Sequence, residues 1–175
     1  TYVGASEVRC STPAAVDVGG GLALSFNFSD EAELLRRAQI FTAGPRAAAL
    51  RSGALSLTTA ETMQKRSIVV HELGLMHAQP YFEAAFDLYI GGGTGGEGVC
   101  ACLGDLPDAP FGEAGAGDGL RVCMLTHAEQ LEVYYDSELV ARRPLAEQLV
   151  RVEHGVGVVI GYRSSGLSVS MGGVM

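Results

Sequence analysis

The stretch that decides the fold reads FEAAFDLYI and runs from Phe82 to Ile90. Large apolar side chains recur at alternate positions, including Phe82, Phe86 and Ile90, and the positions between them include two acidic residues. Successive side chains of a β-strand point to opposite faces, so this alternation predicts a strand with one buried face and one exposed face.

The same period of two recurs on both sides of this stretch and predicts eight more strands. They are expected at residues 22–28, 54–58, 66–73, 98–103, 120–126, 131–135, 155–162 and 167–171. A short helix is predicted over residues 29–38, because N-capping and acidic residues begin this segment and basic residues end it.

The composition agrees with one all-β domain. The chain has 175 residues, of which 47% are apolar and 18% charged, and this balance is typical of a folded protein. Its 24 glycines favour short strands joined by tight turns.

The charge and the apolar pattern exclude two kinds of partner. The formal net charge is -8, and an acidic surface repels phosphate backbones, so no nucleic-acid binding is expected. No apolar run approaches the ~20 residues that span a bilayer, so no membrane insertion is expected. The first residues do not form a secretory leader, which predicts a mature protein or an internal segment.

The cysteines and one asparagine favour an oxidising, extracellular setting. The even number of cysteines, four, is compatible with disulfides but too low for a disulfide scaffold. Asn27 begins the sequon Asn-Phe-Ser and lies on the predicted exposed face of its strand, so it is a candidate glycosylation site.

The motifs that suggest catalysis have simpler explanations, so neither an enzyme nor a cofactor is expected. The glycines from Gly91 to Gly96 fit a dinucleotide motif, but a strand rather than a helix follows them. His71 and His77 are too far apart for a zincin helix. Glu132 and Asp136 share a face of one strand, and we interpret them as solvated surface residues.

Two segments resemble the concanavalin A-like lectin/glucanase superfamily. Residues 82–99 resemble the family's long strand, loop and following strand, and residues 111–122 resemble its glycine-rich loop and the next strand. The resemblance covers residues 20–175 and is strongest to modules of large surface proteins of algae and other protists. It implies an antiparallel jelly-roll sandwich of two sheets over residues 21–175. Residues 1–20 resemble a linker or the tail of a preceding immunoglobulin-like IPT/TIG repeat.

The resemblance also implies candidate carbohydrate-binding residues. The family's loop aspartate corresponds to Glu97, followed by Gly98, and its glycine loop corresponds to Gly115, Gly117 and Gly119. The family's calcium site does not transfer, because a thiol and an alkyl group replace its acidic ligands on the strand at 122–126. No metal is therefore expected.

The two residues that replace the calcium ligands, Cys123 and Leu125, indicate that the concave face of the predicted sandwich is apolar rather than solvated. By alternation Cys100 and Cys102 share a face of the neighbouring strand. Two explanations remain open: another segment or a partner covers this face, or Cys123 forms a disulfide with Cys100 or Cys102.

These observations predict a non-catalytic structural or adhesive module of a large extracellular or ciliary-surface assembly. Its expected partners are other protein segments or subunits of that assembly. The alternative is a calcium-independent lectin domain that binds glycans with its glycine-rich loops. Family domains continue beyond the last hairpin of this chain, so we expect its final strand to come from elsewhere or to be lacking, and the open edge to be covered.

Overall fold

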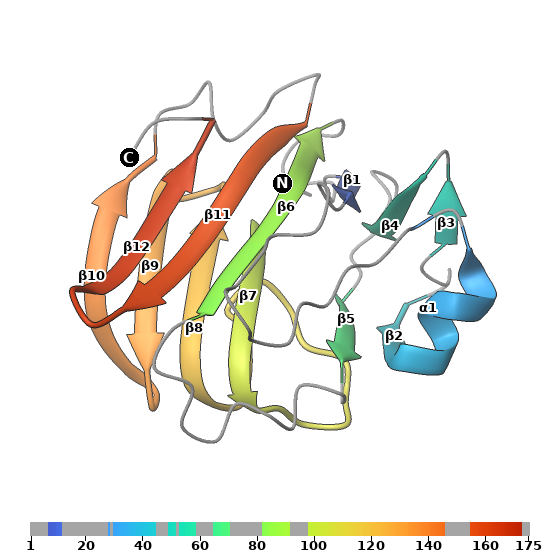
Figure 1. Cartoon of the computed structure of the whole chain (residues 1–175), viewed down its shortest axis with the longest axis horizontal. Coiled ribbons are helices and arrows are strands. Elements are labelled where there is room, and N and C mark those ends of the chain that lie inside the picture. The colour runs from blue at the N-terminus through green and yellow to red at the C-terminus, as the bar shows by residue number, and fades with distance from the viewer. Residues whose placement is uncertain are drawn as a thin grey trace.

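The described part of the chain forms an all-β sandwich of antiparallel sheets with one short helix. The computed structural model describes residues 7–11, 28, 30–44, 49–51, 53–58, 65–70, 82–91, 98–145 and 155–172. In Figure 1 one half of the six-stranded sheet lies in front of the four-stranded sheet, and its other half extends to the right.

The six-stranded sheet has the order β12-β11-β6-β1-β4-β3. Its strands are β1 (Glu7–Ser11), β3 (Ala49–Arg51), β4 (Ala54–Thr58), β6 (Phe82–Gly91), β11 (Val156–Arg163) and β12 (Gly166–Met171). The predicted strand at Phe82 is thus β6, and it lies in the interior of this sheet between β11 and β1.

The four-stranded sheet has the order β10-β9-β8-β7. Its strands are β7 (Gly98–Asp105), β8 (Asp118–Leu125), β9 (Gln130–Tyr135) and β10 (Glu138–Pro144). A two-residue turn joins β9 to β10, with φ of 45° at Asp136 and 68° at Ser137. Two successive positive φ angles define the type I′ turn, whose twist matches that of a hairpin.

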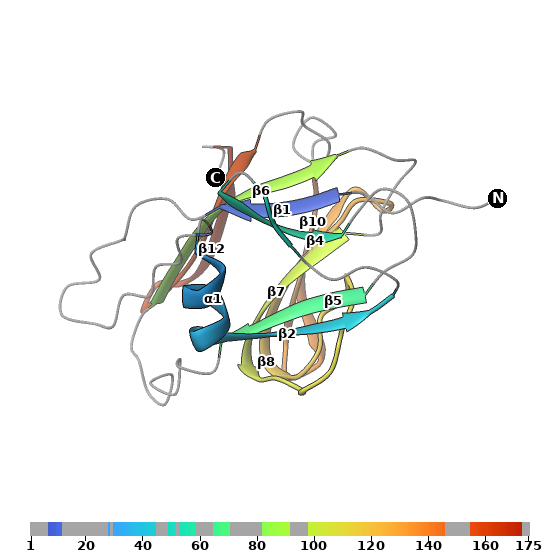
Figure 2. The ribbon, with the colours of Figure 1, turned by 90° about the vertical axis from the view of Figure 1, so that its right-hand side faces the viewer.

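A helix and a strand pair lie to one side of the two sheets (Figure 2). The pair is formed by β2 (Ala38–Ala43) and β5 (Lys65–Val70). The helix α1 (Glu31–Arg37) begins where predicted: the Asp30 carboxylate accepts a hydrogen bond from the backbone N–H of Glu33 at 3.0 Å. This cap satisfies one of the free amides at the helix N-terminus.

The main core fills the space between the two large sheets. Leu88 and Ile90 of β6 are buried here with Val158 and Ile160 of β11, and Val122 and Met124 of β8 belong to the same cluster. A smaller cluster beside it includes Phe28, Leu34 and Leu55.

Two features of the fold differ from the expectations. Residues 7–11 were expected within a linker or the tail of a preceding module, whereas they form β1 between β6 and β4. The strands β2, β3 and β10 were not predicted. Expected strand residues 22–27 and 71–73, and Asn27 with its candidate glycan, lie outside the described residues.

The smaller cluster offers a matched test of whether it is part of the cooperative core. Leu55 is 1% exposed, whereas Leu35 on α1 is 55% exposed. We expect Leu55→Ala to lower the free energy of unfolding by about 2–5 kcal/mol, because it removes buried methyl groups and leaves a cavity. Leu35→Ala should change it by less than about 0.5 kcal/mol. Urea unfolding of both variants measures this, and equal effects would contradict the assignment.

Candidate functional site: the outer face of the four-stranded sheet

The ionisable, thiol and aromatic side chains that could take part in binding or catalysis gather on one face of the four-stranded sheet. This is the face that points away from the core. Val122 and Met124 of β8 are buried in the core, so alternation turns Arg121, Cys123 and Leu125 to the other face. We call this side of β7, β8, β9 and β10 the outer face.

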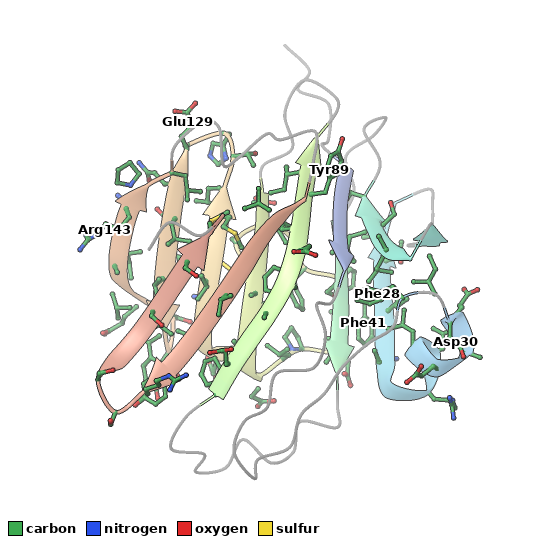
Figure 3. The ribbon with its side chains drawn as sticks, turned by 45° about the horizontal axis from the view of Figure 1, so that its top comes forward. Phe28, Asp30, Phe41, Tyr89, Glu129 and Arg143 are labelled. Atoms are coloured by element: carbon green, nitrogen blue, oxygen red, sulfur yellow. A yellow bond between two sulfur atoms is a disulfide. The ribbon has the colours of Figure 1, made fainter. Side chains whose placement is uncertain are left out.

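A disulfide joins β7 to β8 on the outer face (Figure 3). Cys100 lies directly opposite Cys123 in the ladder, and their sulfur atoms are bonded at 2.06 Å. Cys102, two residues further along β7, has a free thiol. Of the two pairings that the sequence left open, the structure therefore has Cys100–Cys123.

The loop between β7 and β8 folds back over this disulfide. Gly115 has a φ of +67°, and a Cβ atom placed on it would lie 2.7 Å from the sulfur atoms of both Cys100 and Cys102. Only glycine allows the loop to approach the sulfur atoms this closely. A segment of the chain itself thus covers part of the face that was expected to be covered.

Two hydrogen bonds hold this loop in place. The Arg121 guanidinium donates through Nη1 to the carbonyl oxygen of Ala114 at 3.4 Å. On the other side, the hydroxyl of the buried Ser67 in β5 donates to the carbonyl oxygen of Ala109 at 3.1 Å. The loop is therefore tied both to its own sheet and to the β2–β5 pair.

The position of Cys102 beneath the loop disfavours its thiolate form. Burial raises the pKa of this thiol, while a hydrogen bond with the backbone of Ala116 and the charge of Arg121 lower the pKa by less. Because only the thiolate is a strong nucleophile and metal ligand, Cys102 is suited to packing rather than chemistry.

A network of charged and aromatic side chains lies beside the disulfide on the outer face. Glu132 of β9 is only 5% exposed. One oxygen of its carboxylate, Oε1, accepts a hydrogen bond from Arg142 Nε at 2.8 Å and lies 2.7 Å from Arg142 Nη2. The other oxygen, Oε2, accepts a hydrogen bond from the Tyr134 hydroxyl at 2.5 Å. The Arg121 guanidinium lies 4.8 Å from the centre of the Tyr134 ring, a cation–π distance.

This network shifts two ionisation equilibria. The hydrogen bond from Tyr134 and the ion pair with Arg142 lower the pKa of the Glu132 carboxyl despite its burial. The same hydrogen bond raises the pKa of the Tyr134 hydroxyl, which must stay protonated to donate. The network thus stabilises a carboxylate and a neutral phenol in fixed positions.

The structure corrects our interpretation of Glu132 as a solvated surface residue. It is buried because the side chains of Arg142 and Tyr134 contact its carboxylate. Arg142 was not recognised from the sequence, since its pairing with Glu132 depends on a strand, β10, that alternation did not reveal.

The glycines expected to bind carbohydrate lie at two ends of one ladder. Gly98 pairs with Leu125 at one end of β7–β8, while Gly119 pairs with Gly104 near the other. Gly104 follows Gly98 by six positions along the strand, which corresponds to ~20 Å. Gly117 lies beside Asp105 at the far end, and Gly115 lies over the disulfide. Glu97 is outside the described residues.

Among the residues that the structure describes, no group of three or more His, Cys, Asp or Glu side chains could hold a metal ion. The described part of the chain also contains no helix with the length and hydrophobicity needed to cross a bilayer.

Comparisons with protein families, with characterised proteins and with solved structures find no match to this chain. The outer face must therefore be interpreted from its own geometry.

The disulfide should stabilise the sandwich measurably. The double variant Cys100→Ala/Cys123→Ala should lose about 3 kcal/mol of unfolding free energy, because the bond closes a loop across 23 residues of sequence separation. Cys102→Ala is the matched control, since it removes a thiol from the same face without breaking a cross-link. Urea unfolding compares the two, and an equal loss in both would show that packing, not the cross-link, dominates.

The network predicts a pH-dependent stability. Because the pKa of Glu132 is lowered in the folded protein, its ionised form stabilises the fold above the usual carboxyl value of about 4.3. This stabilisation disappears as the pH falls through the lower, folded-state pKa. The difference in unfolding free energy between the wild type and Glu132→Gln should therefore be constant near neutral pH and shrink in acid.

The Tyr134 hydroxyl gives the opposite dependence. Its raised pKa stabilises the fold below about pH 10, and this stabilisation is lost as the pH rises through the folded-state pKa. The difference between the wild type and Tyr134→Phe should shrink only in alkali. Urea unfolding over a pH series measures both differences, and two differences that stay constant with pH would contradict the network.

Proposed function

We propose that this chain is a non-catalytic structural or adhesive module that acts through protein contacts in an extracellular or cell-surface assembly. We further propose that its sandwich is a jelly roll of the concanavalin A-like type. The pairing of a six-stranded with a four-stranded antiparallel sheet supports this finer assignment.

The observation on which the proposal rests is a group of exposed apolar side chains on the β9–β10 hairpin. Tyr135 is 58% exposed, Leu139 44% and Val140 58%. We call these three residues the hairpin patch. They follow one another closely along the hairpin, and β10 forms one edge of the four-stranded sheet (Figure 1). By the strand register Tyr135 lies on the core-side face of the hairpin and Leu139, opposite Tyr134, on the outer face, so the exposed apolar side chains surround the edge rather than one face. Exposed apolar side chains grouped on one element are typical of a contact surface.

The outer face supports a role without catalysis. Its candidate acid, Glu132, is engaged by Arg142 and Tyr134, and its free thiol, Cys102, lies under the 106–117 loop. A general acid or a nucleophile must reach a substrate, whereas these groups are engaged within the protein. Their arrangement is suited to a rigid scaffold.

The disulfide supports an extracellular or surface location. A cross-link between neighbouring strands persists in an oxidising compartment and is rare where glutathione keeps thiols reduced. Glycan binding by the glycine-rich loops receives less support, because Gly98 and Gly119 lie near opposite ends of the β7–β8 ladder.

A photo-crosslinking amino acid at Val140 tests the proposal in the native assembly. We expect cross-links from this position to protein, because the hairpin patch faces the contact. The matched control is the same amino acid at Leu35, which is similarly exposed on α1, and it should give none. Mass spectrometry identifies the linked peptides. A folded protein that cross-links nothing through Val140 but binds a glycan panel would overturn the proposal in favour of a lectin.

A further inference from the structure

Among the residues that the structure describes, the strand β10 pairs with β9 alone, so it is an edge of the four-stranded sheet, and nearly all of its residues are exposed. In Figure 1 it is the outermost strand of its sheet, and Figure 3 shows the side chain of Arg143 pointing away from the molecule at this edge.

The four edges of the two large sheets differ in charge pattern. β12 contains no charged residue, β3 has three residues and one arginine, and β7 has one aspartate. Within this described set, only β10 has charges of opposite sign at its two ends and apolar residues between them. It reads Glu-Leu-Val-Ala-Arg-Arg-Pro from Glu138 to Pro144.

A strand with this pattern is complementary to itself in the antiparallel direction. If two copies of β10 pair about a two-fold axis between Val140 and Ala141, Glu138 of each copy lies opposite Arg143 of the other. Opposite charges directly across a ladder attract, and symmetry produces this pair twice. Parallel pairing in the same register would place like charges together.

The bulge in β10 makes this register possible. Glu138 and Arg143 are an odd number of residues apart, so in a regular strand they would point to opposite faces. The register shift between Leu139 and Ala141 places both on the core-side face, since Glu138 lies opposite Tyr135 and Arg143 opposite Leu131. Residues directly opposite in a ladder share a face, so the two charges can meet across the axis.

Arg142 does not compete for these contacts. It lies opposite Glu132 on the outer face and is engaged by that carboxylate at 2.7 Å. Arg143 in turn donates one hydrogen bond, from Nη1 to the carbonyl oxygen of Arg142 at 3.0 Å, and its side chain projects from the edge.

From these observations we propose that β10 pairs with β10 of a second copy of this chain, which joins two four-stranded sheets into one eight-stranded sheet. The inference rests on the proposed function, because it names a second copy as the partner of the hairpin patch. The contact covers Leu139 and Val140, two of the five exposed large apolar residues in the part of the chain that the structure describes.

Charge reversal tests the pairing on the full chain. Analytical ultracentrifugation should show a reversible dimer of the wild type. Glu138→Arg or Arg143→Glu alone should weaken the dimer at least about tenfold, because each variant places like charges opposite each other twice. The double variant Glu138→Arg/Arg143→Glu exchanges the two charges and should restore the dimer. Arg36→Glu, a reversal on exposed α1, should leave it unchanged.

Two results would overturn the pairing. One is a wild type that stays monomeric at ~1 mM, where even a contact of about 4 kcal/mol is detectable. The other is a double variant that folds, by circular dichroism, but does not dimerise. If the variants fail to fold, hydrogen exchange of the wild type decides: the amides of 138–143 should gain protection with protein concentration, and exchange independent of concentration overturns the pairing.

The cross-linking experiment separates this inference from the proposed function. Links from Val140 to peptides of a second copy support both. Links from Val140 to a different protein would leave the structural role standing and overturn the self-pairing.

Discussion

The packing of β8 against the six-stranded sheet determines the arrangement of the candidate site. Val122 and Met124 are buried against Val158 and Ile160, which are fully buried on β11. Burial of side chains of this size stabilises a fold by about 1.5–3 kcal/mol each, so the orientation of β8 is strongly fixed. Because the side chains of a strand alternate, this orientation turns Cys123 to the outer face. The disulfide, the loop that covers it and the position of Arg121 all depend on that orientation.

The outer face is closed by contacts that the chain makes with itself. A buried carboxylate is costly unless charged and hydrogen-bonding groups surround it, and Glu132 meets this condition through Arg142 and Tyr134. Gly115 closes the other half by bringing the loop against the sulfur atoms of Cys100 and Cys102. The outer face is thus held by a disulfide and a loop on the side of β7 and by an ion pair on the side of β10. Such contacts produce a rigid surface, and a rigid surface loses little conformational entropy when it binds a partner.

The alternation of apolar and polar residues predicted the strands that have one buried face and one exposed face. The other strands form because of pairing with distant segments of the chain, which alternation does not reveal. Alternation identified β6, β8, β9, β11 and β12, because each has a core-facing row of apolar residues. It missed β1, β2, β3 and β10, which form strands because β6, β4, β5 and β9 offer backbone hydrogen-bonding groups to them. The environment of Glu132 was missed for the same reason, since its partner Arg142 is ten residues away on a strand that alternation did not reveal. The spacing of the cysteines allowed two disulfides, and only the register of β7 against β8 selects Cys100–Cys123.

The features that protect the edge of β10 are also those that would make its pairing selective. A bulge, charged residues and a terminal proline each hinder an arbitrary strand from adding to an edge, and β10 has all three. The formal net charge of -8 repels two copies at long range, but at physiological ionic strength this repulsion is screened beyond about 8 Å. Within that distance the local charges decide, and β10 contributes two arginines and one glutamate, so the edge is locally basic on an acidic protein. These charges disfavour most orientations and registers of a second strand and favour one. They therefore provide specificity rather than general adhesiveness, and specificity is the property that a repeating assembly requires of its contacts.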